Sequence, residues 1–374
     1  MKIGFDAKRA FMNASGLGNY SRTLIHSLLQ YFPEHHYYAY TPSAKGELGR
    51  ELLESGKLKV VLPPEILRGF LSSWWRTSMI SEDIRSHNLD VFHGLSNEIP
   101  KRLPFSTKKI VTVHDLIFLR HPEWYPLIDR NIYYKKIRRS CKQADVVVAV
   151  SEQTKKDIHY YLNIPEDKVK VIYQSCEERF FNQAEESLRN DFRKRMNLAG
   201  KFILYVGTIE ERKNLLTLLQ ALLHVKDAAL VVIGKKKAYY EKVSKFISSN
   251  QLQSRVFFPG NLEKGDLQLY FQCASVFVYP SRYEGFGIPV IEALCSGTPV
   301  ITSDVSSLPE AGGTGSLYVN PDDSVGLTER LNQVLNQDGV REKMIRDGLA
   351  HVKQFHPAVT SARMMELYKG SLKS

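Results

Sequence analysis

Short apolar runs alternate with longer stretches of helical spacing from one end of the chain to the other. Within a run nearly every position is apolar, which is typical of a parallel strand that is covered on both faces. The stretches that follow, such as GNYSRTLIHSLLQ at 18–30, repeat apolar residues every three or four positions. This alternation predicts βαβ units and parallel sheets with helices on both sides.

The expected strands form two series. The first is expected at 2–7, 36–41, 58–63, 90–94, 109–115, 145–151 and 169–173. The second is expected at 202–207, 229–234, 255–260, 275–280, 299–304 and 316–321. Two series of this kind predict an α/β protein with two doubly wound, Rossmann-like domains.

A polar and charged stretch at 174–200 separates the two series and is expected to connect the domains. We therefore expect a first domain at 1–175 and a second at 195–353. A further helical pattern at about 354–374 has no strand after it, so it can pack on either domain, including back on the first.

Composition excludes several classes of protein. The 374 residues are 43% hydrophobic and 24% charged, which is a globular composition rather than that of a disordered or coiled-coil chain. No apolar run is long enough to span a membrane, and the start lacks an apolar signal segment, so we expect a cytoplasmic protein that begins at Met1. The four Cys and eleven His are scattered without metal-ligand spacing, so no tightly bound metal is expected.

The net charge of +11 is uneven. Residues 1–175 carry 26 Lys and Arg against 18 Asp and Glu, a net +8, whereas residues 176–374 carry 25 against 22, a net +3. Basic pairs such as those at 135–136 and 138–139 suit nucleic acid, anionic lipid or a phosphorylated substrate. Composition does not choose among these partners.

The first candidate site is the loop at 14–19, which joins the first strand to the first helix. Gly16 and Gly18 in this loop allow backbone N–H groups to approach an anion at a helix N-terminus. The third glycine of a dinucleotide fingerprint is absent, which weakens a nicotinamide-cofactor interpretation. A tight turn that binds no ligand would give the same pattern.

The second candidate is the adjacent pair Arg212 and Lys213, at the start of an apolar helix in the second series. Cations at a helix start oppose the helix dipole, so their presence there suggests a diphosphate as partner. A solvated basic pair on the surface is the alternative.

The third and most informative candidate is the segment 280–297. Gly285 and Gly287 follow a buried strand and can present backbone donors to a ligand, while Pro289 and Gly297 mark the two ends of a helix. Glu284 and Glu292 lie at the mouth of this turn and within the helix, where two carboxylates can hold different hydroxyl groups. A glycine turn with a structural Glu pair is the alternative.

Together these motifs resemble the retaining glycosyltransferases of family 4, which have the GT-B fold of two Rossmann-like domains. The resemblance rests on EGFGIPVIE (284–292) with ALCSGTPVI after it, on VGT (206–208) with RKN (212–214), on GLG (16–18) and on VHD (113–115). It extends over nearly the whole chain. Thr208 departs from the pattern, since some members carry Arg there, so Arg212 must supply that charge alone.

The resemblance implies roles for these residues. Arg212 and Lys213 would bind the donor diphosphate and stabilise the leaving group, in place of a metal or other cofactor. Glu292 would hold the nucleoside ribose and Glu284 the hydroxyl groups of the transferred sugar. The backbone N–H groups of Gly285, Phe286, Gly287 and Ile288, with the Gly16 and Gly18 loop, would complete donor binding.

The resemblance also places His114 near the reacting sugar, although a strand-end histidine with a structural role would look the same. It implies retention of anomeric configuration by a front-face path in which the leaving phosphate helps to deprotonate the acceptor. Double displacement through a carboxylate stays formally open. Asp115 lies beside His114 but can point to the opposite side of a strand.

The donor and acceptor are less well defined by the sequence. The segments VHDLIFLRHPEWY and YVGTIEERKNL look most like mannosyltransferases of bacterial surface-polysaccharide and lipopolysaccharide assembly, so GDP-mannose is the expected donor. A UDP-hexose or a deoxysugar nucleotide is the alternative. Asn261 and Leu262 are expected on the base side of the donor, and the acceptor is expected to be a glycan or a lipid-linked glycan.

The segment Ile66–Arg76 places Trp74 and Trp75 between arginines, which suits a peripheral contact with anionic membrane at the inner face of the cytoplasmic membrane. Core or subunit-contact tryptophans are an equal alternative.

Three other classes of protein are less consistent with the sequence. An oxidoreductase would show the full GxGxxG motif and would not need the paired Glu284 and Glu292. A nucleic-acid-binding protein would show a recognisable binding motif. A non-catalytic sensor of nucleotide sugars would keep Arg212 and Lys213 but would not turn over the donor.

Overall fold

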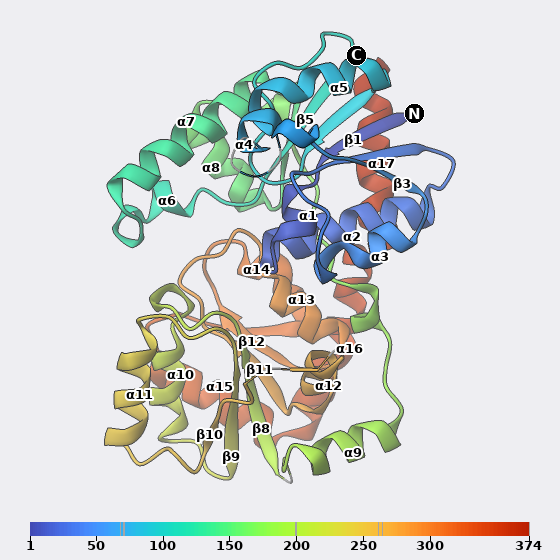
Figure 1. The fold of residues 1–374 in the computed structure, drawn as a ribbon. Helices are drawn as coiled ribbons and strands as arrows, with labels where there is room; N and C mark the ends of the chain where they lie inside the picture. Colours follow the sequence, from blue (N-terminus) through green and yellow to red (C-terminus); the bar gives the residue numbers. More distant parts are fainter. Residues whose placement is uncertain (68, 70–71, 199, 261, 264, 374) are drawn as a thin grey trace. The chain divides into compact units, whose positions relative to one another are not determined.

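The computed structural model describes residues 1–374 apart from 68, 70–71, 199, 261, 264 and 374. The chain divides into two compact units, one made of residues 1–175 and 357–374 and the other of residues 176–356. Each unit contains one parallel β-sheet (Figure 1). Every strand range expected from the sequence overlaps a strand of the structure, which confirms the doubly wound α/β prediction.

The first unit has a seven-stranded sheet with strand order β3-β2-β1-β4-β5-β6-β7. Its strands are β1 (Lys2–Asp6), β2 (His36–Tyr40), β3 (Leu58–Val61), β4 (Val91–Gly94), β5 (Lys108–Val113), β6 (Val146–Ala149) and β7 (Val169–Val171). Its helices are α1 (Lys8–Met12), α2 (Gly16–Tyr31), α3 (Arg50–Glu54), α4 (Ser72–Trp74), α5 (Ile80–His87), α6 (Ile117–Arg120), α7 (Leu127–Gln143), α8 (Glu152–Leu162) and α17 (Pro357–Lys373).

Helices cover both faces of this sheet because each strand alternates its apolar side chains between the two faces. On one face, α2 and α17 pack on β1, where Ile3 and Phe5 are fully buried. On the other face, α7 and α8 pack on β5 and β6 through Val111, Val113 and Val147. The C-terminal helix α17 therefore belongs to the core of the first unit.

One feature of the first unit differs from the sequence predictions, and another decides between two alternatives that the sequence left open. The first strand is followed by the short helix α1, so the loop that contains Gly16 does not connect β1 directly to α2. Trp75 is 1% exposed, and its indole N–H donates to Asp83 Oδ2 at 3.0 Å. Trp75 is thus a core residue, whereas Trp74 is 53% exposed.

The second unit has a six-stranded sheet with strand order β10-β9-β8-β11-β12-β13. Its strands are β8 (Lys201–Val206), β9 (Ala228–Ile233), β10 (Val256–Phe257), β11 (Val276–Tyr279), β12 (Val300–Ser303) and β13 (Ser316–Val319). Its helices are α9 (Glu186–Arg195), α10 (Leu215–Leu222), α11 (Tyr240–Ser249), α12 (Asp266–Cys273), α13 (Ile288–Cys295), α14 (Leu308–Gly312), α15 (Ser324–Asn336) and α16 (Asp338–Val352).

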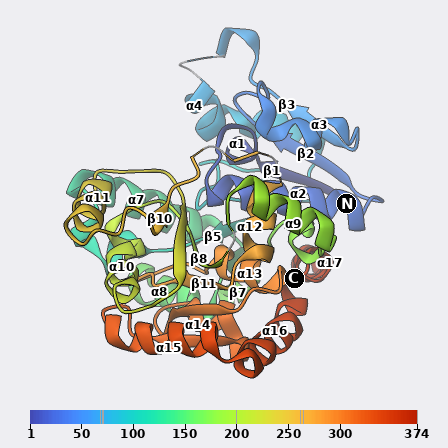
Figure 2. The same ribbon diagram turned by 90° about the horizontal axis from the view of Figure 1, so that it is seen from below.

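This sheet is also covered on both faces, and α10 and α15 lie next to each other on one of them (Figure 2). Alternate residues of β8, Ile203 and Tyr205, pack with α10, α11 and α15. On the other face Phe271 of α12 contacts Phe277 of β11, with ring centroids 5.2 Å apart. Within the described part of the chain, none of the helices is both long enough and apolar enough to cross a bilayer.

The stretch at 174–200, expected as a connection, folds in large part with the second unit. Its helix α9 packs on α12, where Phe192 meets Tyr270 edge to face at 4.8 Å. Arg195 forms an ion pair with Asp266 on the same helix α12. The second compact unit therefore begins at Cys176 rather than near residue 195.

Candidate functional site

The order of strands in the second sheet determines where its candidate residues meet. The chain proceeds from β8 toward β9 and β10 on one side, and from β11 toward β12 and β13 on the other. Open α/β sheets bind ligands beyond the carboxyl ends of the strands at such a reversal. Ile203 of β8 pairs with Val276 of β11, so the segments that follow Val206 and Tyr279 emerge side by side.

The basic pair Arg212 and Lys213 lies in the segment after β8. A single 3₁₀ turn, Glu211–Lys213, carries both residues and ends at Asn214, whose φ of 57° is left-handed. The pair thus precedes helix α10 instead of forming its first turn. The side chains of Arg212 and Lys213 are only 16% and 12% exposed, so the alternative of a solvated surface pair does not hold.

Glu284, in the segment after β11, binds both cations. Its Oε1 accepts hydrogen bonds from Arg212 at 2.8 Å, from Lys213 Nζ at 2.5 Å and from Ser281 Oγ at 2.6 Å. Arg212 also donates to the backbone carbonyl of Tyr283 at 2.6 Å. The structure therefore brings Arg212, Lys213 and Glu284 together in one buried ion cluster.

Burial and charge act in opposite directions in this cluster. Burial favours a neutral Glu284, but Arg212 and Lys213 outweigh it and lower the pKa of Glu284 to about 2. Burial likewise opposes the charge of Arg212, yet Glu284 raises the Arg212 pKa above its usual value. Burial lowers the pKa of Lys213, and the nearby Arg212 lowers it further, against the attraction of Glu284. Arg212 and Glu284 are therefore charged at neutral pH.

Residues that sequence reasoning did not select complete the cluster. Glu210 accepts from Arg212 at 2.9 Å and from Lys237 at 2.6 Å. Tyr279, the last residue of β11, accepts a hydrogen bond from Lys213, whose Nζ lies 4.7 Å from the centre of its ring. Tyr279 could have been found from its place at a strand end. With Lys213 protonated, three cations face two carboxylates, so the cluster keeps a net positive charge.

The turn before α13 is built by glycine and closed by apolar packing. Gly287 has a φ of 119°, and a Cβ there would lie 3.0 Å from Leu308, so a side chain would be both strained and crowded. Phe286 is buried and packs edge to face on Phe355. Phe286 can therefore contribute only its backbone to a ligand. The N-terminus of α13, at Ile288, favours negative charge.

Glu292, in the second turn of α13, has an environment unlike that of Glu284. It is 8% exposed, and burial together with the nearby Glu177 raises its pKa to about 8, with a smaller opposing effect of Arg179. Its carboxyl group is therefore neutral over most of the physiological pH range. A neutral carboxyl group can both donate and accept hydrogen bonds, which suits contact with hydroxyl groups.

Of the two residues expected on the base side of the donor, Leu262 lies in the loop after β10. Leu262 is half-buried in this loop. Asn261 lies outside the described residues.

Gly16 and Gly18 belong to the first unit, where they form the first turn of α2. A Cβ on Gly18 would lie 1.8 Å from the carbonyl oxygen of Asn13, so close packing of the backbone explains this glycine. Gly16 is exposed, with open space around it. A role for this loop in donor binding stays a prediction.

A cluster that sequence reasoning missed lies at the strand-order reversal of the first sheet, between β1 and β4. Arg76 pairs with Asp6 at the end of β1, at 2.5 Å, and with Glu98 beyond β4, at 3.1 Å. Lys136 of α7 also reaches Glu98, at 3.4 Å. Arg76 was expected to flank a membrane contact, but its side chain is 12% exposed and is held by these carboxylates.

His114 follows β5 directly in the first unit and is 6% exposed. Its Nε2 bonds the carbonyl oxygen of Leu95 at 2.8 Å, and its Nδ1 bonds the side-chain amide of Gln174 at 2.9 Å. Burial lowers the pKa of His114 to about 4, so the imidazole is neutral. The Asp115 carboxylate, in contrast, accepts a hydrogen bond from the backbone N–H of Ile117 at 3.2 Å.

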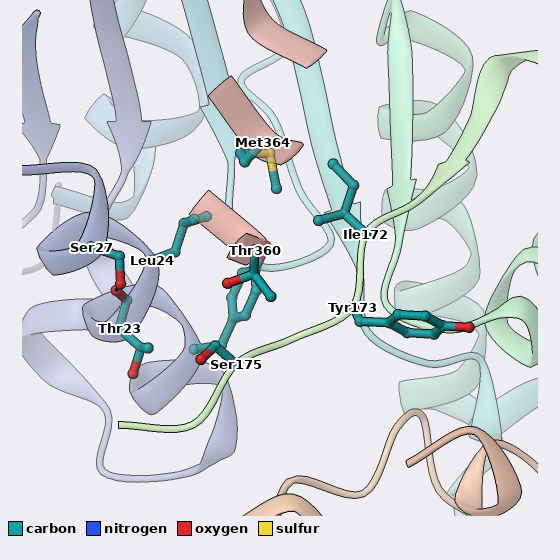
Figure 3. Close-up of a pocket in the computed structure, with 9 residues that line it drawn as sticks. Thr23, Leu24, Ser27, Ile172, Tyr173, Ser175, Thr360 and Met364 are labelled. Carbon is teal, nitrogen blue, oxygen red and sulfur yellow. Dashed lines mark hydrogen bonds between the residues drawn. The ribbon is translucent and has the colours of Figure 1, made fainter. Parts of the chain in front are cut away.

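A small pocket in the first unit is distinct from these residues (Figure 3). It lies among α2, α17 and the segment after β7, and its interior of about 10 Å³ has room for about one water molecule. In Figure 3, Tyr173 extends away from the other labelled side chains. A nucleotide sugar does not fit in this pocket.

Comparison with known proteins identifies the family. The family model "Glycosyl transferases group 1" matches residues 186–351, and "Glycosyltransferase Family 4" matches residues 14–176. Each model thus matches nearly one unit of the chain. The chain belongs to the family 4 glycosyltransferases.

Similar proteins agree with this assignment. O-antigen chain mannosyltransferase B of Escherichia coli is 27% identical over 99% of this chain and 100% of its own length. O-antigen chain mannosyltransferase RfbU of Salmonella typhimurium is 30% identical over 59% of each chain. The crystal structure of Anabaena HepE in complex with UDP and glucose superposes on this chain with a TM-score of 0.77 at 16% identity. The superposition covers 98% of this chain and 99% of that one, which confirms the GT-B fold. This chain is therefore an enzyme, and its reaction is that of a hexosyltransferase.

The raised pKa of Glu292 predicts how the stability of this glycosyltransferase depends on pH. The folded state keeps the Glu292 proton up to about pH 8, whereas an unfolded glutamate loses it near its ordinary value. This group therefore stabilises the fold less and less as the pH rises from about 5 through 8. We expect Glu292→Gln to raise the melting temperature relative to the native chain by a few degrees at pH 9 and little at pH 5.

Thermal unfolding of both proteins across this pH range measures the difference. Glu329→Gln, at an exposed position of α15, is the matched control. If the melting temperatures of Glu292→Gln and the native chain differ by the same amount at every pH, the assignment of a buried, neutral carboxyl group is contradicted.

Proposed function

We propose that this enzyme is a retaining glycosyltransferase that moves mannose from GDP-mannose to a glycan or lipid-linked glycan acceptor in the biosynthesis of bacterial polysaccharide or lipopolysaccharide. The observation that carries the proposal is the buried cluster of Arg212, Lys213 and Glu284 at the strand-order reversal of the second sheet. The names of the two O-antigen mannosyltransferases support the choice of sugar and pathway. A UDP-sugar donor is the second candidate, supported by the UDP bound to the HepE structure.

The cluster can stabilise the leaving group without a metal ion. Arg212 and Lys213 are fixed by Glu284 before any ligand arrives, so little reorganisation is needed when negative charge develops on a diphosphate. The net positive charge of the cluster and the N-terminus of α13 act in the same direction. Glu284 also has oxygen atoms that can accept hydrogen bonds from sugar hydroxyl groups.

The proposed reaction is a front-face substitution. The bond between the anomeric carbon and the diphosphate oxygen breaks, and its electron pair goes to the diphosphate, next to Arg212 and Lys213. The acceptor oxygen bonds to the same face of the sugar, and its proton passes to the departing phosphate oxygen. His114 lies near the sugar as a neutral imidazole in this proposal, and Glu292 contacts the nucleoside ribose.

We expect purified enzyme to transfer radiolabelled mannose from GDP-mannose to a bacterial lipid and glycan extract in the presence of EDTA. This transfer should be at least ten times faster than the transfer of sugars from UDP, ADP or dTDP donors. The fixed cations are the physical reason why the chelator leaves the rate unchanged. Loss of transfer in EDTA with rescue by Mg²⁺ would contradict the metal-independent site. A faster rate with a UDP or dTDP sugar would replace the GDP-mannose proposal.

We expect Lys213→Met to weaken GDP binding about 10- to 100-fold, the range for loss of one charged hydrogen bond of 1.5–3 kcal/mol. Methionine keeps the apolar part of the side chain against Tyr279 and removes the charge. Isothermal titration calorimetry measures the change, with Lys245→Ala on the exposed side of α11 as the control. Equal GDP affinity for Lys213→Met and native enzyme would remove Lys213 from the donor site.

We also propose that the first unit contacts anionic membrane through α7. Ile128, Ile132 and Lys135 recur at intervals of four and three, so they share one face of this helix. Ile128 and Ile132 are 73% and 45% exposed. Arg138 and Lys142 continue this face toward the C-terminal end of the helix. An exposed apolar turn beside a row of cations suits the interface of an anionic bilayer.

The loop between β4 and β5 extends this surface. Its Lys101 carbonyl accepts a hydrogen bond from Gln143 of α7 at 3.3 Å, which places the loop beside the C-terminal end of the helix. Phe105 of the loop is fully exposed, and Lys109 lies over its ring at 5.4 Å. The membrane surface is thus assigned to α7 and this loop instead of to Trp75 and Arg76.

We expect the enzyme to sediment with vesicles of phosphatidylglycerol and phosphatidylcholine but not with pure phosphatidylcholine. The double variant Ile128→Ser/Ile132→Ser should bind at least fivefold more weakly, because it removes the apolar part of the surface. Val325→Ser on α15, which changes a residue of 69% exposure, is the matched control. Equal sedimentation of the double variant and the native enzyme would contradict the proposal.

A further inference from the structure

Gln174 is an unexpected neighbour of His114. It lies three residues beyond the end of β7, and β6 separates β7 from β5, the strand that His114 follows. The Gln174 side chain is buried, with the residue only 6% exposed, and crosses this distance to His114. Burying a long polar side chain costs free energy, because the side chain loses conformational entropy and its hydrogen bonds to water. The contact with His114 has to compensate for this cost.

The hydrogen bonds around His114 favour one protonation state. The Leu95 carbonyl can only accept, so the Nε2 atom of His114 carries the hydrogen. The amide nitrogen of Gln174 faces the Nδ1 atom of His114 and can only donate, so in this amide orientation Nδ1 is an unprotonated acceptor. The two partners together favour the neutral Nε2–H tautomer over the imidazolium ion, which would place an N–H against the amide N–H unless the amide turned over.

The other groups around the imidazole add no charge. The Tyr20 ring of α2 meets it edge to face, with ring centroids 4.7 Å apart. His93 of β4 is fully buried, and burial together with the nearby His114 lowers its pKa to about 3. Burial raises the pKa of Tyr20 well above its usual value. Tyr20 and His93 are therefore both neutral at neutral pH.

We propose that Gln174 is a positioning residue that holds His114 as the neutral Nε2–H tautomer for the transfer step. The inference rests on the proposed function, in which the sugar approaches His114. Positive charge develops at the anomeric carbon as the leaving group departs, and a cationic imidazole beside it would raise the barrier. The amide nitrogen of Gln174 disfavours that cation without adding a charge of its own.

Two substitutions separate this role from a merely structural one. Gln174→Glu replaces the donor by a carboxylate, which favours a proton on Nδ1 and an imidazolium ion. Gln174→Met keeps the length of the side chain but provides neither a donor nor a charge. Gln220→Glu is the control. It makes the same chemical change at an exposed position of α10, which is far from His114 in the sequence and belongs to the second unit.

The first measurement needs no substrate. Proton–nitrogen correlation spectra of the full-length enzyme labelled with ¹⁵N-histidine report the tautomer and pKa of His114, whose signals are identified by their loss in His114→Gln. We expect the native protein to show the Nε2–H form with no titration above pH 5. Gln174→Glu should raise the pKa of His114 from about 4 to roughly 6 or higher. Unchanged His114 signals in Gln174→Glu would overturn the proposal.

The second measurement is the pH profile of kcat. In Gln174→Glu we expect kcat to fall at least tenfold as the pH drops below the new pKa of His114, with the donor KM within about twofold of the native value. Gln174→Met should lower kcat without a new ionisation, and Gln220→Glu should match the native profile. A raised His114 pKa without a change in the kcat profile would overturn the role in transfer. If the native enzyme transfers no sugar, the proposed function fails, while the spectra still test the contact.

Discussion

The candidate donor site depends on one carboxylate that two buried cations share. Arg212 and Lys213 are neighbours in the chain, so their charges repel each other, and burial adds a penalty for each. Glu284 compensates for both by accepting hydrogen bonds from both side chains at Oε1. The cations are thereby held in fixed positions inside the unit, and the low pKa of Glu284, about 2, keeps its carboxylate charged at neutral pH.

This arrangement differs from that around His114 in the first unit. His114 is equally buried but has no ionic partner among the described residues, so burial keeps it neutral. Its two ring nitrogen atoms are satisfied by a backbone carbonyl and a side-chain amide. The same physical cost of burying a charge thus gives two outcomes. It produces a fixed ion cluster where a carboxylate is available, and a neutral hydrogen-bonded imidazole where none is.

Much of the fold could be predicted from the sequence because parallel strands covered on both faces require near-continuous apolar runs. Each expected strand range overlaps a strand, and the strand-to-helix alternation identified the doubly wound sheets. The candidate residues at 212–213 and 284 were visible for a related reason, since they lie in the segments that follow β8 and β11. The assignment of function to these residues stays a prediction. Trp75 was not predictable, because its partner Asp83 and its burial depend on packing with α5 and its neighbours.

The sequence by itself determined which segments become strands and helices, and that two sheets form, because these depend on periodicity over a few residues. Only the tertiary structure decided the pairings across long separations. Arg76 meets Asp6 across 70 positions, Lys213 meets Glu284 across 71, and Gln174 meets His114 across 60. Such contacts depend on the order of strands within a sheet, which brings distant strand ends to one edge, and no local pattern of residues specifies that order.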